Sequence, residues 1–129
     1  MDDTIKTTWA PRALSLLRIV AGLLFLEHGL SKFFGFPAPF PMAVAPFSLL
    51  GAAGALEIVG GALVAIGLFT RPVAFVLSGQ MAVAYFIAHF PKGLYPLGNG
   101  GDAAVLYCFI FLYIAAAGAG PWSVDAKRG

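Results

Sequence analysis

Residues 49–69 read LLGAAGALEIVGGALVAIGLF, and Glu57 is the single ionisable side chain in this stretch. An α-helix rises about 1.5 Å per residue, so a stretch of this length spans the roughly 30 Å hydrocarbon core of a membrane. Repeated glycine would weaken a helix in water, but small residues mark helix–helix contacts in membranes. The stretch therefore predicts a membrane-spanning helix that packs closely against a neighbour.

The rest of the chain has the same character. The sequence of 129 residues is 60% hydrophobic and 11% charged, with a mean hydropathy of +0.87, whereas a soluble domain carries about 25% charged residues. The apolar residues form blocks close to the ~20 residues that cross a bilayer: about 13–30, 49–69, 72–90 and 103–119. We predict one all-α domain over residues 1–129, an integral membrane four-helix bundle.

Basic residues predict the orientation. Four spans place both termini on one side, and the tails and the second loop hold Lys6, Arg12, Arg71, Lys127 and Arg128, against Lys32 and Lys92 in the other loops. By the positive-inside rule both termini are cytoplasmic, in the cell inner membrane. The first block ends in a charged pair and lacks a small-residue cleavage site, so it is not read as a signal peptide. The net charge of +2 argues against nucleic acid as a partner.

Polar residues inside the spans are the candidate functional residues, because a charge at the centre of a membrane helix costs about 2.5 to 3.5 kcal/mol. Glu57 shares a face with Gly54 and Gly61, so it is predicted to point at a packed neighbour. Its alternatives are proton transfer and a structural hydrogen bond. In the first span, Glu27 projects away from a stripe made of Arg18, Gly22, Phe25, Gly29 and Lys32.

The topology predicts one polar cluster in the outer half of the bundle, roofed by the Pro-rich first loop. Its expected catalytic residues are Glu57 and His89, and its expected substrate-binding residues are His28, Lys32, Tyr85 and Asp102. Asp102 has an alternative reading as an anion in the first turn of the fourth span. Structural polar residues are expected at the cytoplasmic side: Arg18, for which snorkelling to the interface is the alternative, together with Arg71 and Asp125.

Histidine and carboxylate side chains in an apolar pocket fit a quinone, because they donate hydrogen bonds to its carbonyls and relay protons. The histidines lie on separate spans and lack the local spacing of a metal motif, so no metal site is predicted. No motif indicates haem or flavin binding. Cys108 is the one cysteine, so the chain cannot shuttle electrons through a disulfide of its own, and we expect Cys108 to be a packing residue.

Five motifs in order resemble the DoxX family of small membrane proteins, over about residues 12–126. They are Arg18-x₃-Gly22 with His28-Gly29-x₂-Lys32; Glu57-x₂-Gly60-Gly61 with Gly67-x₃-Arg71; Met81 and His89; Gly100-Gly101-Asp102; and Gly120-x₂-Ser123-x-Asp125. The resemblance implies a four-helix membrane bundle and an association with redox systems. DoxD-like relatives form part of a thiosulfate:quinone oxidoreductase, and others belong to assemblies that handle thiols and oxidative stress. Asp102 stands where many relatives have Glu.

The residues and the resemblance together predict a membrane subunit of a redox assembly, quinone-linked or concerned with thiols and oxidative stress. Its partners would be the lipid bilayer and either a redox protein or further copies of the chain. Two alternatives stay open. The chain is a non-catalytic anchor or assembly subunit, or it is a small-molecule or proton-coupled carrier that uses Glu57. Whether it is an enzyme in its own right is left open.

Overall fold

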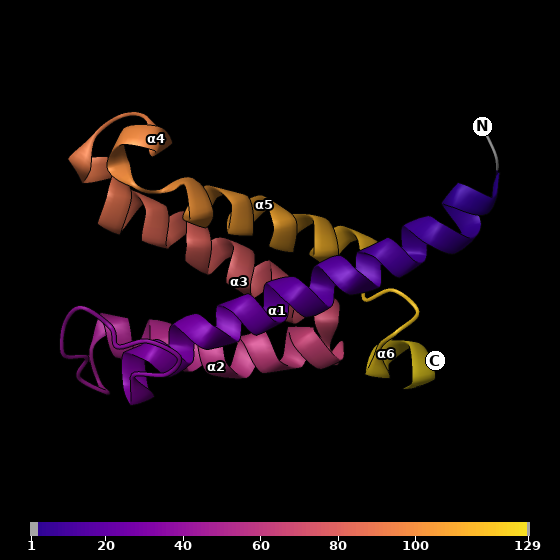
Figure 1. Cartoon of the computed structure of the whole chain (residues 1–129), viewed down its shortest axis with the longest axis horizontal. Coiled ribbons are helices and arrows are strands. Elements are labelled where there is room, and N and C mark those ends of the chain that lie inside the picture. Colours follow the sequence, from indigo (N-terminus) through magenta and orange to yellow (C-terminus); the bar gives the residue numbers. More distant parts are fainter. Residues whose placement is uncertain (1–2, 129) are drawn as a thin grey trace.

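The computed structural model describes residues 3–128, which form helices and connecting loops without a β-strand (Figure 1). The long helices are α1 (Ala10–Phe34), α2 (Leu49–Ile66), α3 (Thr70–Ala84) and α5 (Asp102–Ala117). Shorter elements are the π-helical turns η1 (Ile5–Trp9) and η2 (Tyr85–His89), the 3₁₀ turn η3 (Phe90–Lys92), α4 (Pro96–Asn99) and α6 (Val124–Arg128). The predicted all-α class is confirmed, and a helix lies in each predicted span.

Three helical segments of the described chain are long and apolar enough to cross a membrane: Ile5–Phe34, Leu49–Ile66 and Thr70–Lys92. α5 has a similar apolar composition but is shorter, at 16 residues. A fourth crossing therefore stays a prediction. Asp102 is the first residue of α5 and is exposed, as its reading as a first-turn anion requires.

The two ends of the bundle differ. Figure 1 shows the start of α1 and the C-terminal helix α6 at one end, which we call the terminal end. The opposite end carries the α1–α2 connection, residues 35–48, and α4, and we call it the loop end. The first and last described helices thus lie at the same end of the bundle.

Glycine allows α1 and α2 to approach closely. A Cβ atom added to Gly22 would lie 2.6 Å from the backbone nitrogen of Ala65, and one added to Gly61 would lie 2.7 Å from that of Leu26. These contacts are with backbone, which cannot move aside as a flexible side chain can. The predicted close packing along the glycine faces is confirmed, and it puts α1 beside α2.

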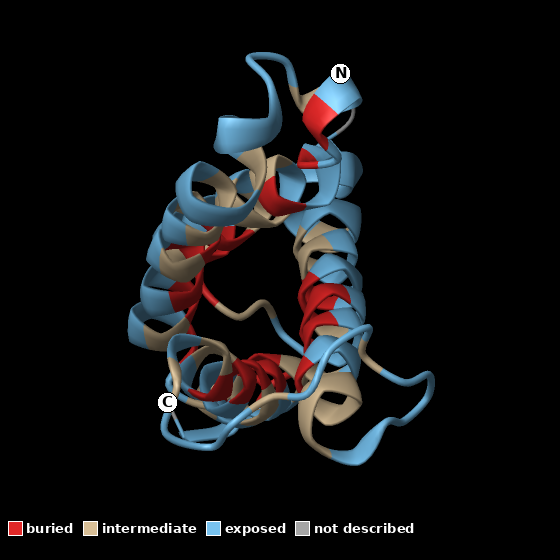
Figure 2. Ribbon diagram, turned by 90° about the vertical axis from the view of Figure 1, so that its left-hand side faces the viewer, coloured by how far each residue is buried: buried red, intermediate tan, exposed pale blue. Residues whose placement is uncertain are grey.

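The helices pack chiefly as two pairs, α1 with α2 and α3 with α5. The turn between α2 and α3 is short, but the packing between these two helices is limited. The reason is side-chain size: Leu77 of α3 lies over Gly60 of α2, whereas the glycines of α1 and α2 meet backbone to backbone. Figure 2 shows the buried residues on the inward faces of the helices and the exposed ones outside. The buried hydrophobic core contains Ala21, Phe25, Val64, Ala74, Leu77, Met81, Ala104, Phe111 and Ile114.

Candidate functional site

Glu57 lies in the middle of α2 and is 3% exposed. Its Oε1 atom is 2.6 Å from the Lys32 ammonium nitrogen at the end of α1, and the Gln80 amide of α3 donates to its Oε2 at 3.0 Å. The Lys32–Glu57 pair is the one ion pair within residues 3–128. Three helices are therefore joined at one carboxylate, and the prediction that Glu57 faces a packed neighbour is confirmed.

The first loop covers this site. The ammonium of Lys32 lies 5.3 Å from the centre of the Phe40 ring, a cation–π distance, and the Ser31 hydroxyl donates to Ala38 O at 2.7 Å. The Gln80 amide nitrogen is also 3.4 Å from Ala53 O, but its buried Oε1 atom has no hydrogen-bond partner among the described residues. A buried acceptor without a donor is costly. At this site, Gln80 Oε1 thus lacks a hydrogen-bond donor among the described residues.

A second polar set surrounds Asn99, which is buried. Its side-chain amide donates to the Tyr85 hydroxyl and to Gly93 O, both at 3.0 Å, and its Oδ1 accepts from the Gly101 N–H at 2.8 Å. Nδ1 of His89 lies 3.2 Å from the backbone oxygen of Asn99. The rings of Tyr85 and His89 are stacked with their centres 6.3 Å apart.

The remaining expected members lie apart from both sets. His28 is exposed, and its ring meets Tyr107 edge-on at 6.0 Å. Asp102 makes no side-chain hydrogen bond to the described residues. Glu27 is exposed, in agreement with its expected direction away from the stripe. The structure therefore divides the expected single cluster into separate groups. Residues in the same half of the bundle can face different neighbours around it.

The terminal end holds a third polar set, centred on Arg18, which is fully buried. Its guanidinium donates to Val64 O at 2.9 Å, to Trp122 O at 2.6 Å and to Ala119 O. Snorkelling to the interface, the alternative considered for Arg18, is wrong, because the end of α2 and the segment before α6 supply enough carbonyl acceptors to keep the charge inside.

The other two structural polar residues cap helix ends. Asp125 accepts from the N–H groups of Phe69 and Thr70, at 3.0 and 2.9 Å, at the start of α3. Partial burial acts to raise the pKa of Asp125, but these hydrogen bonds and the nearby charge of Arg128 outweigh it, so the pKa lies below its usual range. Arg71 donates to Ala116 O at 2.6 Å, near the end of α5. All three predicted structural residues thus serve at this end of the bundle.

Two residues of these polar sets, Gln80 and Asn99, were not predicted from the sequence. Gln80 had a usable signal, because an amide inside an apolar span needs partners as a charge does. Asn99 stands before two glycines and reads as an ordinary turn residue. No group of three or more His, Cys, Asp or Glu side chains suited to a metal occurs in the described part of the chain.

An apolar groove of about 270 Å³ runs between α1 and α5. Leu17, Val20 and Leu24 line one wall, and Leu106, Tyr107 and Ile110 line the other. Cys108 lies on a different face of α5, half-buried and 3.6 Å from the Ser78 hydroxyl. It packs at the α3–α5 contact, as expected of a small packing residue.

The fold and the buried polar sets define an integral membrane helical protein. The profile of the DoxX family matches residues 13–90, which include α2, α3 and all of α1 except its first three residues. The chain belongs to the DoxX family.

Relatives agree with this placement. An uncharacterized protein of Haemophilus influenzae is 45% identical over 125 residues, which cover 92% of each chain. A second uncharacterized protein of that organism is 29% identical over 123 residues, 88% of this chain and 81% of the relative. The protein named "Putative oxidoreductase CatD" of Bacillus subtilis is 41% identical over 61 residues, 45% of this chain and 46% of its own length. No solved structure shows a significant match.

Proposed function

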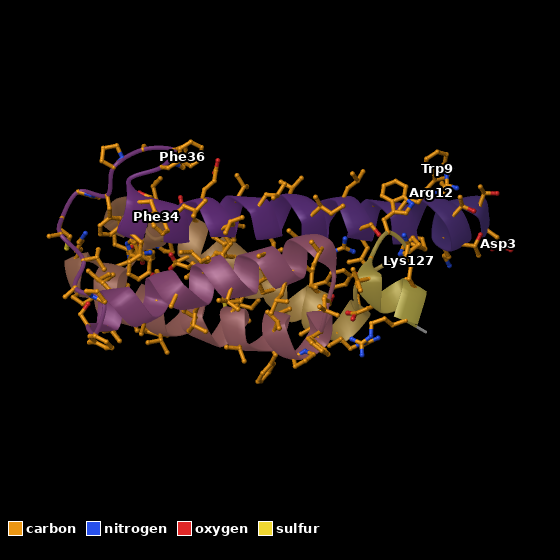
Figure 3. All side chains as sticks on the ribbon, turned by 90° about the horizontal axis from the view of Figure 1, so that it is seen from below. Asp3, Trp9, Arg12, Phe34, Phe36 and Lys127 are labelled. Carbon is orange, nitrogen blue, oxygen red and sulfur yellow. The ribbon has the colours of Figure 1, made fainter. Side chains whose placement is uncertain are left out.

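We propose that this DoxX protein crosses the inner membrane four times, with its loop end outside, and acts as the membrane subunit of a redox assembly. Figure 3 places both Arg12 and Lys127 at the terminal end, and the Arg12 guanidinium lies 5.1 Å from the centre of the Trp9 ring. Basic and aromatic residues of this kind suit a cytoplasmic interface. The name of the CatD relative supports a redox role.

The observation that carries the proposal is the Glu57 site. A carboxylate in the middle of an apolar helix is costly, and here it comes with an ammonium, an amide and an unpaired buried acceptor, Gln80 Oε1. A quinol hydroxyl is a donor that Gln80 Oε1 can accept. In this proposal the quinol ring enters from the bilayer between apolar helix faces, and the polar groups around Glu57 support the choice of a quinol.

Oxidation of the quinol breaks two O–H bonds and releases two protons and two electrons. Glu57 takes up the two protons one after the other, which weakens its pairing with Lys32 each time, and releases each towards the loop end, where His89 accepts it and passes it to the outer face. The electrons go to a haem, flavin or iron–sulfur centre of a partner protein. His28 is left out of this scheme, because its ring is exposed and contacts Tyr107 and none of the residues around Glu57.

The test is quinol oxidation by the protein reconstituted with its copurifying partner in liposomes, with decylubiquinol as the probe. We expect Glu57→Gln and His89→Ala each to lower turnover roughly a hundredfold, the usual effect of losing a proton-transfer group. Glu27→Gln is the matched control, because it removes an exposed carboxylate from α1 and should leave turnover unchanged.

One observation favours the anchor alternative: both oxygens of Glu57 have partners within the chain, as a purely structural ion pair would. In that case the protein binds no decylubiquinol, and Glu57→Gln reduces thermal stability and partner binding while the complex that still forms keeps its turnover. That combination of results overturns the redox proposal.

A further inference from the structure

His89 is the last residue of η2 (Tyr85–His89). η2 is a π-helical turn in which the Phe90 N–H bonds to Tyr85 O. Such turns are uncommon and occur often at functional sites. Within this turn the rings of Tyr85 and His89, four residues apart, are stacked with an angle of 28° between their planes.

The hydrogen bond of His89 fixes its tautomer. Its partner is the backbone oxygen of Asn99, at 3.2 Å, and a carbonyl oxygen can only accept. Nδ1 must therefore carry the proton, and Nε2 of the neutral ring presents a lone pair. Nε2 has no hydrogen-bond partner among the described residues, and it is not one of the fully buried polar atoms that lack one. It is thus open to a proton donor.

Asn99 is fixed in turn by its own side chain. The amide group bridges Gly93 O, the Tyr85 hydroxyl and the Gly101 N–H, and this holds the backbone oxygen that His89 uses. The Tyr85 oxygen accepts from Asn99, so the hydroxyl proton of Tyr85 stays available for donation. A base and a donor therefore stand side by side on η2, both held by one buried amide.

We infer that Asn99 is a positioning residue that holds His89 in the Nδ1–H tautomer, with Nε2 as the atom that accepts protons at the loop end. The role of His89 in proton transfer rests on the proposed function, whereas the tautomer does not. In the step itself, the proton bonds to Nε2 to give the imidazolium and leaves to water at the outer face, and no electrons move.

The tautomer can be measured directly by ¹H–¹⁵N correlation spectra of the imidazole in phospholipid nanodiscs. The chain has two histidines, so His28→Asn leaves His89 as the single imidazole signal. We expect a protonated Nδ1 and an unprotonated Nε2 in this background. Neither Asn99→Ala nor Asn99→Asp keeps the amide donors of Asn99. Each variant should therefore convert the His89 signal to the Nε2–H form or to a mixture of the two tautomers.

A signal from the Nε2–H form, or from a rapid mixture, in the protein with Asn99 intact overturns the inference, and this measurement requires no Asn99 variant to fold. The second readout is the pH profile of quinol oxidation. We expect Asn99→Asp to displace the limb of that profile that His89→Ala abolishes, with roughly a tenfold or greater loss of turnover. If His89 keeps a fixed Nδ1–H tautomer but turnover is unaltered in Asn99→Asp and His89→Ala, the proton-accepting role of His89 is overturned. The quinol site at Glu57 is then judged by its own variants.

Discussion

Lys32 at the end of α1 and Glu57 in the middle of α2 form an ion pair with 2.6 Å between Nζ and Oε1, and their side chains are 10% and 4% exposed. Burial removes both charges from water, so each depends on the other for compensation. Because Gln80 joins the same carboxylate, the pair links the α1–α2 unit to the α3–α5 unit at the loop end.

The ion pair should behave as a coupled unit. Lys32→Met leaves Glu57 without its cation, and Glu57→Met leaves the ammonium without its anion, so each should lower the free energy of unfolding by about 3 kcal/mol or more. The double variant, which buries no charge there, should be more stable than either single one. Denaturant unfolding in mixed micelles measures all four proteins, and additive losses in the double variant would contradict the coupling.

Close packing of α1 on α2 makes Gly22 intolerant of a side chain. The added Cβ of Gly22→Ala would lie 2.6 Å from the Ala65 nitrogen, so the helices must move apart, at a cost of about 1 to 3 kcal/mol in unfolding free energy. Gly79→Ala in α3 is the matched control, because nothing lies within 4 Å of its Cβ position. Its stability should be unchanged or slightly higher, and equal losses in the two variants would rule out this explanation.

Arg18 should hold the C-terminal segment in place. Lysine at this position cannot supply the several donors that reach Val64, Ala119 and Trp122, so Arg18→Lys should expose the amides of residues 118–126 to faster hydrogen exchange and cost about 2 kcal/mol or more. The control is Arg12→Lys, which keeps a cation beside Trp9. Unchanged exchange in Arg18→Lys is the contrary result.

Asp125 gives the terminal end a dependence on pH. Its folded pKa lies below its usual value, and an unfolded aspartate titrates near pH ~3.9. Its contribution to stability is therefore fully present above that pH and is lost as the pH falls through the lower folded pKa. Melting temperatures between pH 3 and pH 7 should fall less steeply on acidification in Asp125→Asn than in the wild type. Asp102→Asn, at the opposite end, controls for the loss of a carboxylate.

Periodicity and hydropathy were sufficient to predict the helices and the residues that share a face on each. Arg18, Gly22, Phe25 and Gly29 share one face of α1, as the predicted stripe requires, and this face is buried, because a 3.6-residue repeat depends only on local geometry. Charge placement likewise predicted a shared set of structural polar residues at the terminal end, where Arg18 and Asp125 lie.

Side-chain partners could not be predicted in the same way. The sequence placed His28, Glu57 and His89 in the outer half of the bundle, but it left their directions around the bundle free. In the structure they contact Tyr107, Lys32 and Asn99, respectively. The roles of Gln80 and Asn99 depend on the contact of α3 with α2 and on the packing of the turn before α5 against η2.

The sequence by itself determined an all-helical membrane protein of the DoxX family with a carboxylate that needs a partner, because apolar length and helical period are properties of single segments. Only the tertiary structure decided that Lys32 and Gln80 meet Glu57, and that Asn99 holds His89. These contacts depend on how closely glycine lets α1 approach α2 and on which residues then face each other across the bundle.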